Sequence, residues 1–355
     1  MTRLMKRIAR FLLALPLFLA GVGAILSGVE AAMYNASAAS KLLGNRPEAV
    51  EALKGNGENM PFSFAVVGDT RGTETSERLL EAVASEKEVR FIVHVGDFVK
   101  NPDIWNHNFF RAEYGEDMPR QVPMFLVAGN HDLCRTGEHR SVSRERLVGP
   151  ERFDELYGTR KFCFSYANSF FIISDIDDAG NEYLDFLEGA LRDNRDKHEH
   201  VFVFLHIPPR NLSHEIDSRE LPQQDRLLAL LKQYRVTRAF FGDFHGYWRG
   251  QMEETTVLIT GGGGSELAGD ETYGFYHLLV VTVDGAMITE RIITRPPTLD
   301  VEDHLEEFCY VRVFPLFGTS PWFYRVAGAA LIAGGIMLLF FTRRRKRGAP
   351  SAVAP

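Results

Sequence analysis

Residues 124–132 read Met-Phe-Leu-Val-Ala-Gly-Asn-His-Asp, a short apolar run that ends in a glycine followed by three polar residues. A run of this length, rich in strand-forming residues, favours a buried β-strand. The glycine permits a sharp turn and a close approach of the backbone. The stretch therefore predicts a buried strand whose carboxyl end presents Asn130, His131 and Asp132.

The same arrangement of apolar run and polar turn recurs along the chain. The four further examples are Phe64–Val67 before Gly68-Asp69-Thr70-Arg71, Ile92–Val95 before Gly96-Asp97, Val203–Leu205 before His206, and Ala239–Phe241 before Gly242-Asp243-Phe244-His245. Ligands of open α/β sheets bind outside the carboxyl ends of the strands, so we expect these loops to converge. Carboxylate and amide oxygens together with imidazole nitrogens suit Mn, Fe, Zn or similar ions.

The segments around these motifs predict an α/β fold. Helical periodicity occurs between the strands, at Ser76–Glu86, Ser143–Leu156, Tyr183–Arg192 and Gln224–Tyr234. Further strands are predicted at Phe162–Tyr166 and Phe170–Ser174, which read as a hairpin, and at Thr256–Thr260, Tyr276–Val283 and Ala286–Thr294. The chain thus alternates strands and helices and finishes in antiparallel strands.

In order and spacing, the five motifs resemble those of the calcineurin-like metallophosphoesterase family, which includes purple acid phosphatases and many phosphodiesterases. Gly129-Asn130-His131-Asp132 is the most specific of the five, and the resemblance extends from residue 62 to about residue 290. It implies a four-layer αββα sandwich. It also implies a phosphoric ester hydrolase that cleaves mono- or diesters with a hydroxide bridging two divalent metal ions.

The resemblance assigns metal ligands residue by residue. It implies Asp69 and His245 for the first metal, Asn130 and His206 for the second, and Asp97 as the bridge between them. His131 would lie beside the leaving group as a general acid or an orienting partner. Arg71 and Asp132 complete the predicted catalytic set.

Two positions depart from the family pattern. The first motif normally reads Asp-x-His and here ends in Arg71, while the last normally reads Gly-His-x-His and here has Asp243 in place of the first histidine. Guanidinium carries only donors and cannot bind a cation, so the first metal loses a ligand. Asp243 exchanges imidazole for carboxylate at the second metal. The oxygen-rich set favours Mn, with Fe, Mg and Zn as alternatives.

The two departures allow two arrangements. In a working enzyme, Asp243 points at the second metal and Arg71 faces the open cleft, where its guanidinium takes phosphate oxygens bidentately. In a relic, Arg71 forms a direct ion pair with Asp243 in place of a metal. The alternatives to a hydrolase are therefore a catalytically silent protein that binds a phosphorylated ligand and a membrane-anchored scaffold.

Both ends of the chain contain apolar runs flanked by basic residues. We assign residues 1–44 to a signal peptide or N-terminal membrane anchor, 45–295 to the catalytic domain, 296–321 to a linker, 322–342 to a transmembrane helix and 343–355 to a basic cytoplasmic tail. Basic flanks favour the cytoplasmic side of a membrane. This orientation predicts a domain outside the cytoplasm, periplasmic if the protein resides in a bacterial inner membrane.

The charge distribution restricts the partners. All 47 acidic residues lie between Glu30 and Glu307, so the body is strongly acidic and a broad nucleic-acid surface is excluded. A phosphorylated small molecule or phosphodiester remains the expected substrate.

Three weaker signals remain in the body of the chain. The Gly261–Gly264 run either brings backbone N–H groups to the substrate or forms a flexible turn. His107 and His139 are interpreted as solvated loop residues.

Overall fold

The computed structural model describes most of the chain. The described residues are 3–36, 40–55, 57–58, 60–72, 74–116, 122–135, 146–176, 181–212, 216–268, 271–297 and 301–340. The predicted tail 343–355, the last two residues of the predicted transmembrane helix and His139 lie outside them. The chain forms two compact units. One consists of residues 38–311, and the other consists of the two ends, residues 1–37 and 312–355.

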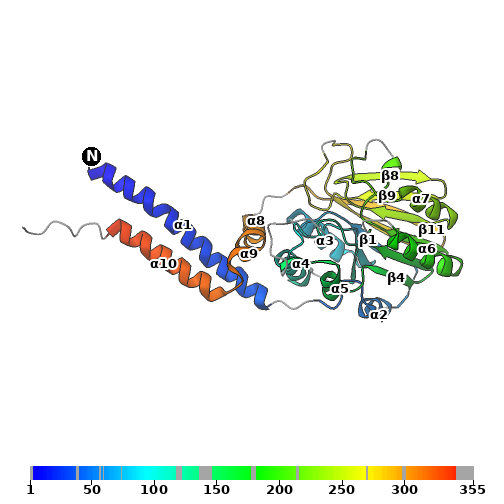
Figure 1. Ribbon diagram of the computed structural model, residues 1–355, viewed down its shortest axis with the longest axis horizontal. Coiled ribbons are helices and arrows are strands. Elements are labelled where there is room, and N and C mark those ends of the chain that lie inside the picture. Colours follow the sequence, from blue (N-terminus) through cyan, green and yellow to red (C-terminus); the bar gives the residue numbers. More distant parts are fainter. Residues whose placement is uncertain are drawn as a thin grey trace, which may run out of the picture. The chain divides into compact units, whose positions relative to one another are not determined.

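Two β-sheets form the centre of residues 38–311 (Figure 1). The first sheet has the order β11 (Met287–Thr294), β10 (His277–Asp284), β1 (Phe62–Val67), β2 (Val89–His94) and β3 (Met124–Leu126). The second has the order β4 (Lys161–Tyr166), β5 (Ser169–Ser174), β6 (His200–Phe204), β7 (Arg238–Phe241), β9 (Thr255–Thr260) and β8 (Tyr247–Met252). The strands β1, β2 and β3 are parallel to one another, as are β5, β6, β7 and β9.

Helices cover the outer faces of both sheets. Those on the first sheet are α3 (Glu74–Ser85), α4 (Ile104–Glu116) and α5 (Pro150–Tyr157), and those on the second are α6 (Glu182–Asn194) and α7 (Gln224–Gln233). The helix α2 (Pro47–Gly55) instead contributes Ala49 and Leu53 to the core between the sheets. Short 3-10 turns occupy Arg195–Lys197 and Arg210–Leu212.

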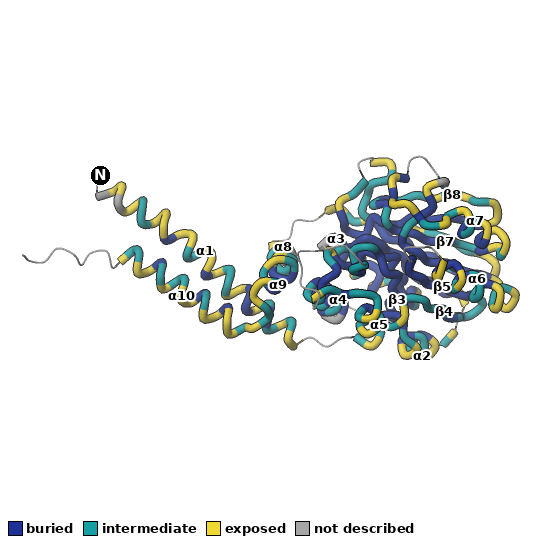
Figure 2. The backbone as a smooth tube through the Cα atoms, viewed as in Figure 1, coloured by how far each residue is buried: buried dark blue, intermediate teal, exposed yellow. Residues whose placement is uncertain are grey.

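The alternation of side chains along β1 explains this layering. Phe64 and Val66 face the core between the sheets, whereas Ala65 and Val67 face the core under the helices. Successive residues of a strand point to opposite faces, so a strand buried on both sides is apolar at nearly every position. All six residues of β1 are buried, as Figure 2 shows for the central strands generally. The predicted four-layer αββα fold is confirmed.

Aromatic rings hold the two sheets together. Phe64 of the first sheet meets Phe171 and Phe202 of the second edge-to-face, with centroids 5.4 and 5.1 Å apart. It also stacks on Phe91 of the neighbouring strand at 5.3 Å. Edge-to-face and offset rings add stabilisation to the burial of their area, so this cluster fixes how the sheets face each other.

Several elements differ from the sequence-based expectation. The helices α2 and α4 and the strand β8 were not expected, because none has a strong apolar period of its own. The helix expected at Ser143–Leu156 begins only at Pro150. Part of the predicted linker is helical, with α8 (Val301–Phe308) leading into the π-helical stretch Cys309–Val313. Tyr310 is buried and stacks on Phe109 of α4 at 4.4 Å.

The second unit contains α1 (Arg3–Ala36), α9 (Phe314–Phe317) and α10 (Pro321–Phe340). Within it, α1 and α10 lie antiparallel and approach through glycines. A Cβ on Gly328 would lie 2.6 Å from the Gly21 carbonyl oxygen, and a Cβ on Gly28 would lie 3.1 Å from the Cβ of Tyr324. Small residues allow helix backbones to pack this closely. Arg7–Ala36 and Pro321–Phe340 are both long and apolar enough to cross a membrane.

We predict that Phe64→Ala lowers the free energy of unfolding of the domain by about 3–5 kcal/mol, because the cavity opens where both sheets meet. Urea unfolding of the full chain in detergent, followed by near-ultraviolet circular dichroism, measures the change. The exposed Met287 of β11 provides a control, since Met287→Ala should shift the value by no more than about 0.5 kcal/mol. Equal effects of the two substitutions would contradict a central role for Phe64.

Candidate metal centre

The strand ends of both sheets supply the site. Asp69 and Arg71 follow β1, Asp97 follows β2, and Asn130 to Asp132 follow β3, while His206 follows β6 and Asp243 and His245 follow β7. These residues come together at one edge of the sandwich, as the motifs predicted. Asp132 is the exception, because its carboxylate turns towards backbone amides.

The backbone takes an unusual conformation at these turns. Asp69, Arg71, Asp97 and Asp243 have φ of 58°, 52°, 57° and 60°. For residues other than glycine this left-handed region costs roughly 1–3 kcal/mol and is concentrated at functional sites. Three of these four residues, Asp69, Asp97 and Asp243, carry the carboxylates of the predicted site.

Three histidines share one orientation. The Nδ1 atoms of His131, His206 and His245 lie 2.8, 2.8 and 2.6 Å from the carbonyl oxygens of Lys100, Val95 and Glu266. A carbonyl only accepts, so each Nδ1 carries a proton, and in the neutral ring each Nε2 offers its lone pair to the site. Backbone carbonyls hold metal-binding histidines in this way.

Oxygen atoms of three residues surround the Nε2 of His206, and together with His206 they form one group of four. That nitrogen lies 3.1 Å from Asn130 Oδ1, 3.3 Å from Asp97 Oδ1 and 3.7 Å from Asp243 Oδ1. A lone pair facing three oxygens requires a positive charge between them. Burial lowers the pKa of His206, but Asp97, Asp69 and Asp243 outweigh burial and raise it to about 9. A divalent cation would satisfy the same demand, so these residues fit a metal ion.

A second group consists of Asp69, Asp97 and His245, whose ligand atoms lie within 4.8 Å of one another. Asp69 is fully buried, and its Oδ1 has no hydrogen-bond partner. Burial, together with Asp97 and Asp243, raises the pKa of Asp69 well above its usual value. An unpartnered buried carboxylate oxygen is also consistent with a cation nearby.

Arg71 joins this second group. Its Nη2 donates to Asp97 Oδ2 and to His245 Nε2, each at 3.2 Å, and its side chain is 22% exposed. Among the described residues, no ion pair links Arg71 to Asp243. The arrangement expected of a relic is therefore not the one found. The enzyme arrangement placed Arg71 in the open cleft without partners in the protein, and this is not found either.

His131 and Asp132 have different surroundings. The Nε2 of His131 lies 3.9 Å from Asp97 Oδ2 at the partly exposed side of the site. Asp132 is fully buried, and its carboxylate accepts the backbone N–H groups of Asp97, Gly129 and Val99. Burial raises the pKa of Asp132 to about 7. In this structure its carboxylate positions the loops after β2 and β3, and its catalytic role stays a prediction.

Two residues near the site have surroundings that local patterns did not indicate. His107 is buried, not solvated, and bridges the hydroxyl of Tyr157 and the carbonyl of Asp132. The backbone N–H of Arg219 donates to Asp243 Oδ2 at 2.8 Å, and its exposed guanidinium lies 3.9 Å from Asp243 Oδ1. Neither contact is local in sequence.

The glycine run packs against the Asp69 turn. Gly263 N donates to the Gly68 carbonyl, and a Cβ on Gly261 would lie 2.8 Å from Asp69 Oδ2. The lack of a side chain at Gly261 thus makes room for the Asp69 carboxylate.

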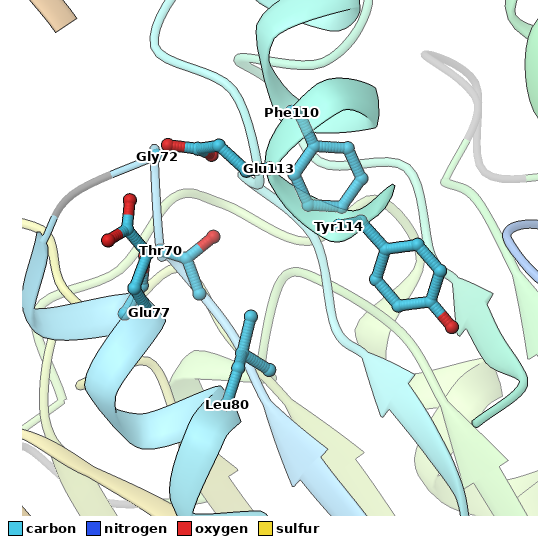
Figure 3. A pocket seen from close by; sticks show the side chains of 8 residues that line it. Thr70, Gly72, Glu77, Leu80, Phe110, Glu113 and Tyr114 are labelled. Carbon is cyan, nitrogen blue, oxygen red and sulfur yellow. The ribbon is translucent and has the colours of Figure 1, made fainter. Parts of the chain in front are cut away.

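A separate small cavity lies beside the site, between α3 and α4 (Figure 3). It has room for about one water molecule, with a volume of about 20 Å³, and is lined by Thr70, Gly72, Leu80, Phe110 and Tyr114 among others. None of the predicted metal ligands lines it. It is too small to hold a phosphate ester.

Comparison with solved structures shows the fold in other proteins. A purple acid phosphatase from yellow lupin seeds matches with a TM-score of 0.52 and 15% identity over 67% of this chain. The match covers 52% of the lupin chain, so this protein spans about half of that enzyme.

Two further structures have lower scores. GAP50 of Plasmodium, described as the anchor in the inner membrane complex, has a TM-score of 0.47 and 16% identity, over 66% of this chain and 85% of its own. A dimetal phosphatase from Danio rerio has a TM-score of 0.42 and 14% identity, over 66% and 99%. No curated protein sequence matches this chain.

The sequence model for calcineurin-like phosphoesterases matches residues 62–247, which is more than half of the chain and includes all of the motifs described above. This protein therefore belongs to the calcineurin-like phosphoesterase family.

Proposed function

We propose that this protein is a metal-dependent hydrolase that cleaves phosphate mono- or diesters outside the cytoplasm. Family membership supports phosphoester hydrolysis in general. The observation that carries the specific proposal is the orientation of His206 and its neighbours, where one imidazole lone pair faces an amide oxygen and two carboxylates. A scaffold has no need for such a cluster.

A bound divalent cation would polarise the phosphoryl group and activate water. The oxygen-rich ligands favour Mn²⁺, with Fe, Mg and Zn as alternatives. The residues around the cation would hold the reacting groups in position. Asp97 has a central place, because Oδ1 faces His206 while Oδ2 faces Arg71.

His131 is the candidate for handling the proton of the leaving group. Burial lowers its pKa and Asp97 opposes this effect, so the ring is neutral at pH 7. In the neutral ring, Nε2 accepts a hydrogen bond and thereby orients a hydrogen-bond donor in the cleft. It donates to a leaving oxygen only after it has gained a proton.

The chain ends support a membrane location for this activity. We propose that α1 and α10 both cross the membrane as the antiparallel pair described above, so that α1 is a retained anchor and not a cleaved signal. Antiparallel packing places the start of α1 and the end of α10 on one side, and both are flanked by basic residues. The positive-inside bias then places the domain outside.

The direct test of the proposed function is hydrolysis of p-nitrophenyl mono- and diesters by the purified full chain in detergent, before and after metal removal. We expect turnover that chelation abolishes and Mn²⁺ restores. Turnover insensitive to chelation, or its absence from the metal-loaded protein, would contradict the proposal.

We predict that Asp97→Asn lowers the turnover number by about 10³-fold or more, the largest loss from any single substitution, since this carboxylate serves both ligand groups. Steady-state kinetics measures the loss. Asp284→Asn, at an exposed strand end, is the matched control and should retain full activity. More than a few per cent of the original rate after Asp97→Asn would argue against a metal held by this residue.

We predict that His131→Ala lowers turnover by about 10²–10⁴-fold while the bound metal is retained, because this side chain acts on the leaving group. Metal content measured beside the kinetics distinguishes this role from that of a ligand. Parallel loss of metal and activity would place His131 among the ligands.

We predict that a protease added to intact cells or spheroplasts digests the domain but not the chain termini. N-terminal sequencing should find a mature protein that still contains the whole of the candidate span Arg7–Ala36. A mature chain that starts after Ala36 would show that α1 is cleaved, and a protected domain would reverse the topology.

A further inference from the structure

The position of Arg71 bears on how many metal ions this site holds. The family holds two, and the resemblance implies Asp69, Asp97 and His245 as the ligands of the first. The Nη2 atom of Arg71 lies among these ligands, at 3.2 Å from both Asp97 Oδ2 and His245 Nε2. A positive charge from the chain itself is thus already present at this position.

The hydrogen bond to His245 competes directly with metal binding. His245 donates through Nδ1 to the Glu266 carbonyl, so the lone pair on Nε2 is its single acceptor. That lone pair accepts from Arg71 in this structure. It cannot serve a metal ion at the same time, and the guanidinium has no lone pair to offer in exchange.

The backbone around Arg71 supports this placement. Arg71 N donates to the Asp97 carbonyl at 3.1 Å, and the preceding Thr70 bonds to the buried His94 at 3.0 Å. Both Arg71 and Gly72 adopt positive φ, and a Cβ on Gly72 would collide with Phe109. The turn therefore has fixed contacts on both sides of the arginine.

The other ligand group does not include Arg71. Asp97 Oδ1, Asn130 Oδ1 and Asp243 Oδ1 lie 3.3, 3.1 and 3.7 Å from His206 Nε2, whose lone pair faces them. Three oxygens and one nitrogen are ligands that a divalent cation such as Mn²⁺ accepts, and water would complete its coordination. Asp243 adds a negative charge here, while Arg71 adds a positive one at the neighbouring position.

We propose that this chain binds a single divalent cation, at Asp97, Asn130, His206 and Asp243, and that the Arg71 guanidinium replaces the other cation of the family. The proposal rests on the proposed function and specifies its metal content. A substrate phosphate at this site would meet one metal ion and one fixed guanidinium. The two departures from the family pattern are then one coordinated change.

The test counts Mn²⁺ on the full chain in detergent. The protein is stripped with a chelator, dialysed against MnCl₂ and freed of excess ion, and bound manganese is measured by mass spectrometry and electron paramagnetic resonance. We expect one ion per chain with the spectrum of an isolated Mn²⁺. His245→Ala should retain that ion, whereas Asp243→Ala should lose it.

The converse variant restores the family residue. Arg71→His removes the guanidinium and supplies an imidazole, and histidine tolerates positive φ better than most residues. We expect a second ion and an exchange-coupled spectrum. Arg192→His is the matched control, because this exposed arginine of α6 lies outside both ligand groups, and that variant should still bind one ion.

Two coupled ions in the unaltered protein would overturn the single-ion proposal while leaving the proposed hydrolase intact. Loss of the only ion in His245→Ala would overturn it as well, by placing the metal at the other position. Failure of the unaltered chain to bind any ion would contradict both proposals.

Discussion

Three carboxylates buried together at the edge of two sheets are the constraint on which this site depends. Asp69 and Asp97 are almost inaccessible to solvent, and the side chain of Asp243 is 8% exposed. At the 4.8 Å that bounds the first ligand group, two such charges repel by about 3 kcal/mol even at an effective dielectric constant of 20. The fold can keep them ionised only by placing positive charge or hydrogen-bond donors among them.

The fold supplies these groups by bringing the carboxyl ends of strands from both sheets together at one edge. Aromatic packing of Phe64 against Phe171 and Phe202 fixes the facing of the sheets, and through it the distance between Asp97 of one sheet and His206 of the other. Each of the three carboxylates lies at a left-handed backbone position just after a strand. Backbone donors stabilise the arrangement further, as when Asp243 N donates to Asp69 Oδ2 at 3.1 Å.

The two departures from the family pattern, Arg71 and Asp243, both change the charge at this cluster of carboxylates. A guanidinium brings a fixed charge that needs no supply of metal, but it cannot act as a Lewis acid or bind water as a ligand. In the proposed single-ion site, the remaining oxygen-rich group would keep that chemistry available at one position. Arg219, whose backbone N–H binds Asp243, contributes a further positive charge beside it. Of the two arrangements drawn from sequence, the relic paired Arg71 with Asp243 and the enzyme left Arg71 facing the open cleft. In the structure Arg71 pairs with Asp97 and His245 instead.

The sequence by itself determined the strands β1, β2, β3, β6 and β7 and the identity of the residues at their ends, because apolar runs and glycine turns are encoded within a few neighbouring residues. It missed α2 and α4, whose burial depends on distant partners, and assigned residues 301–311 to a linker although Tyr310 packs on Phe109. Only the tertiary structure decided that Asp132 turns towards backbone amides, that His107 is buried, and that Arg71 reaches His245. Each of these depends on a contact between segments far apart in the chain, and no local pattern specifies such a contact.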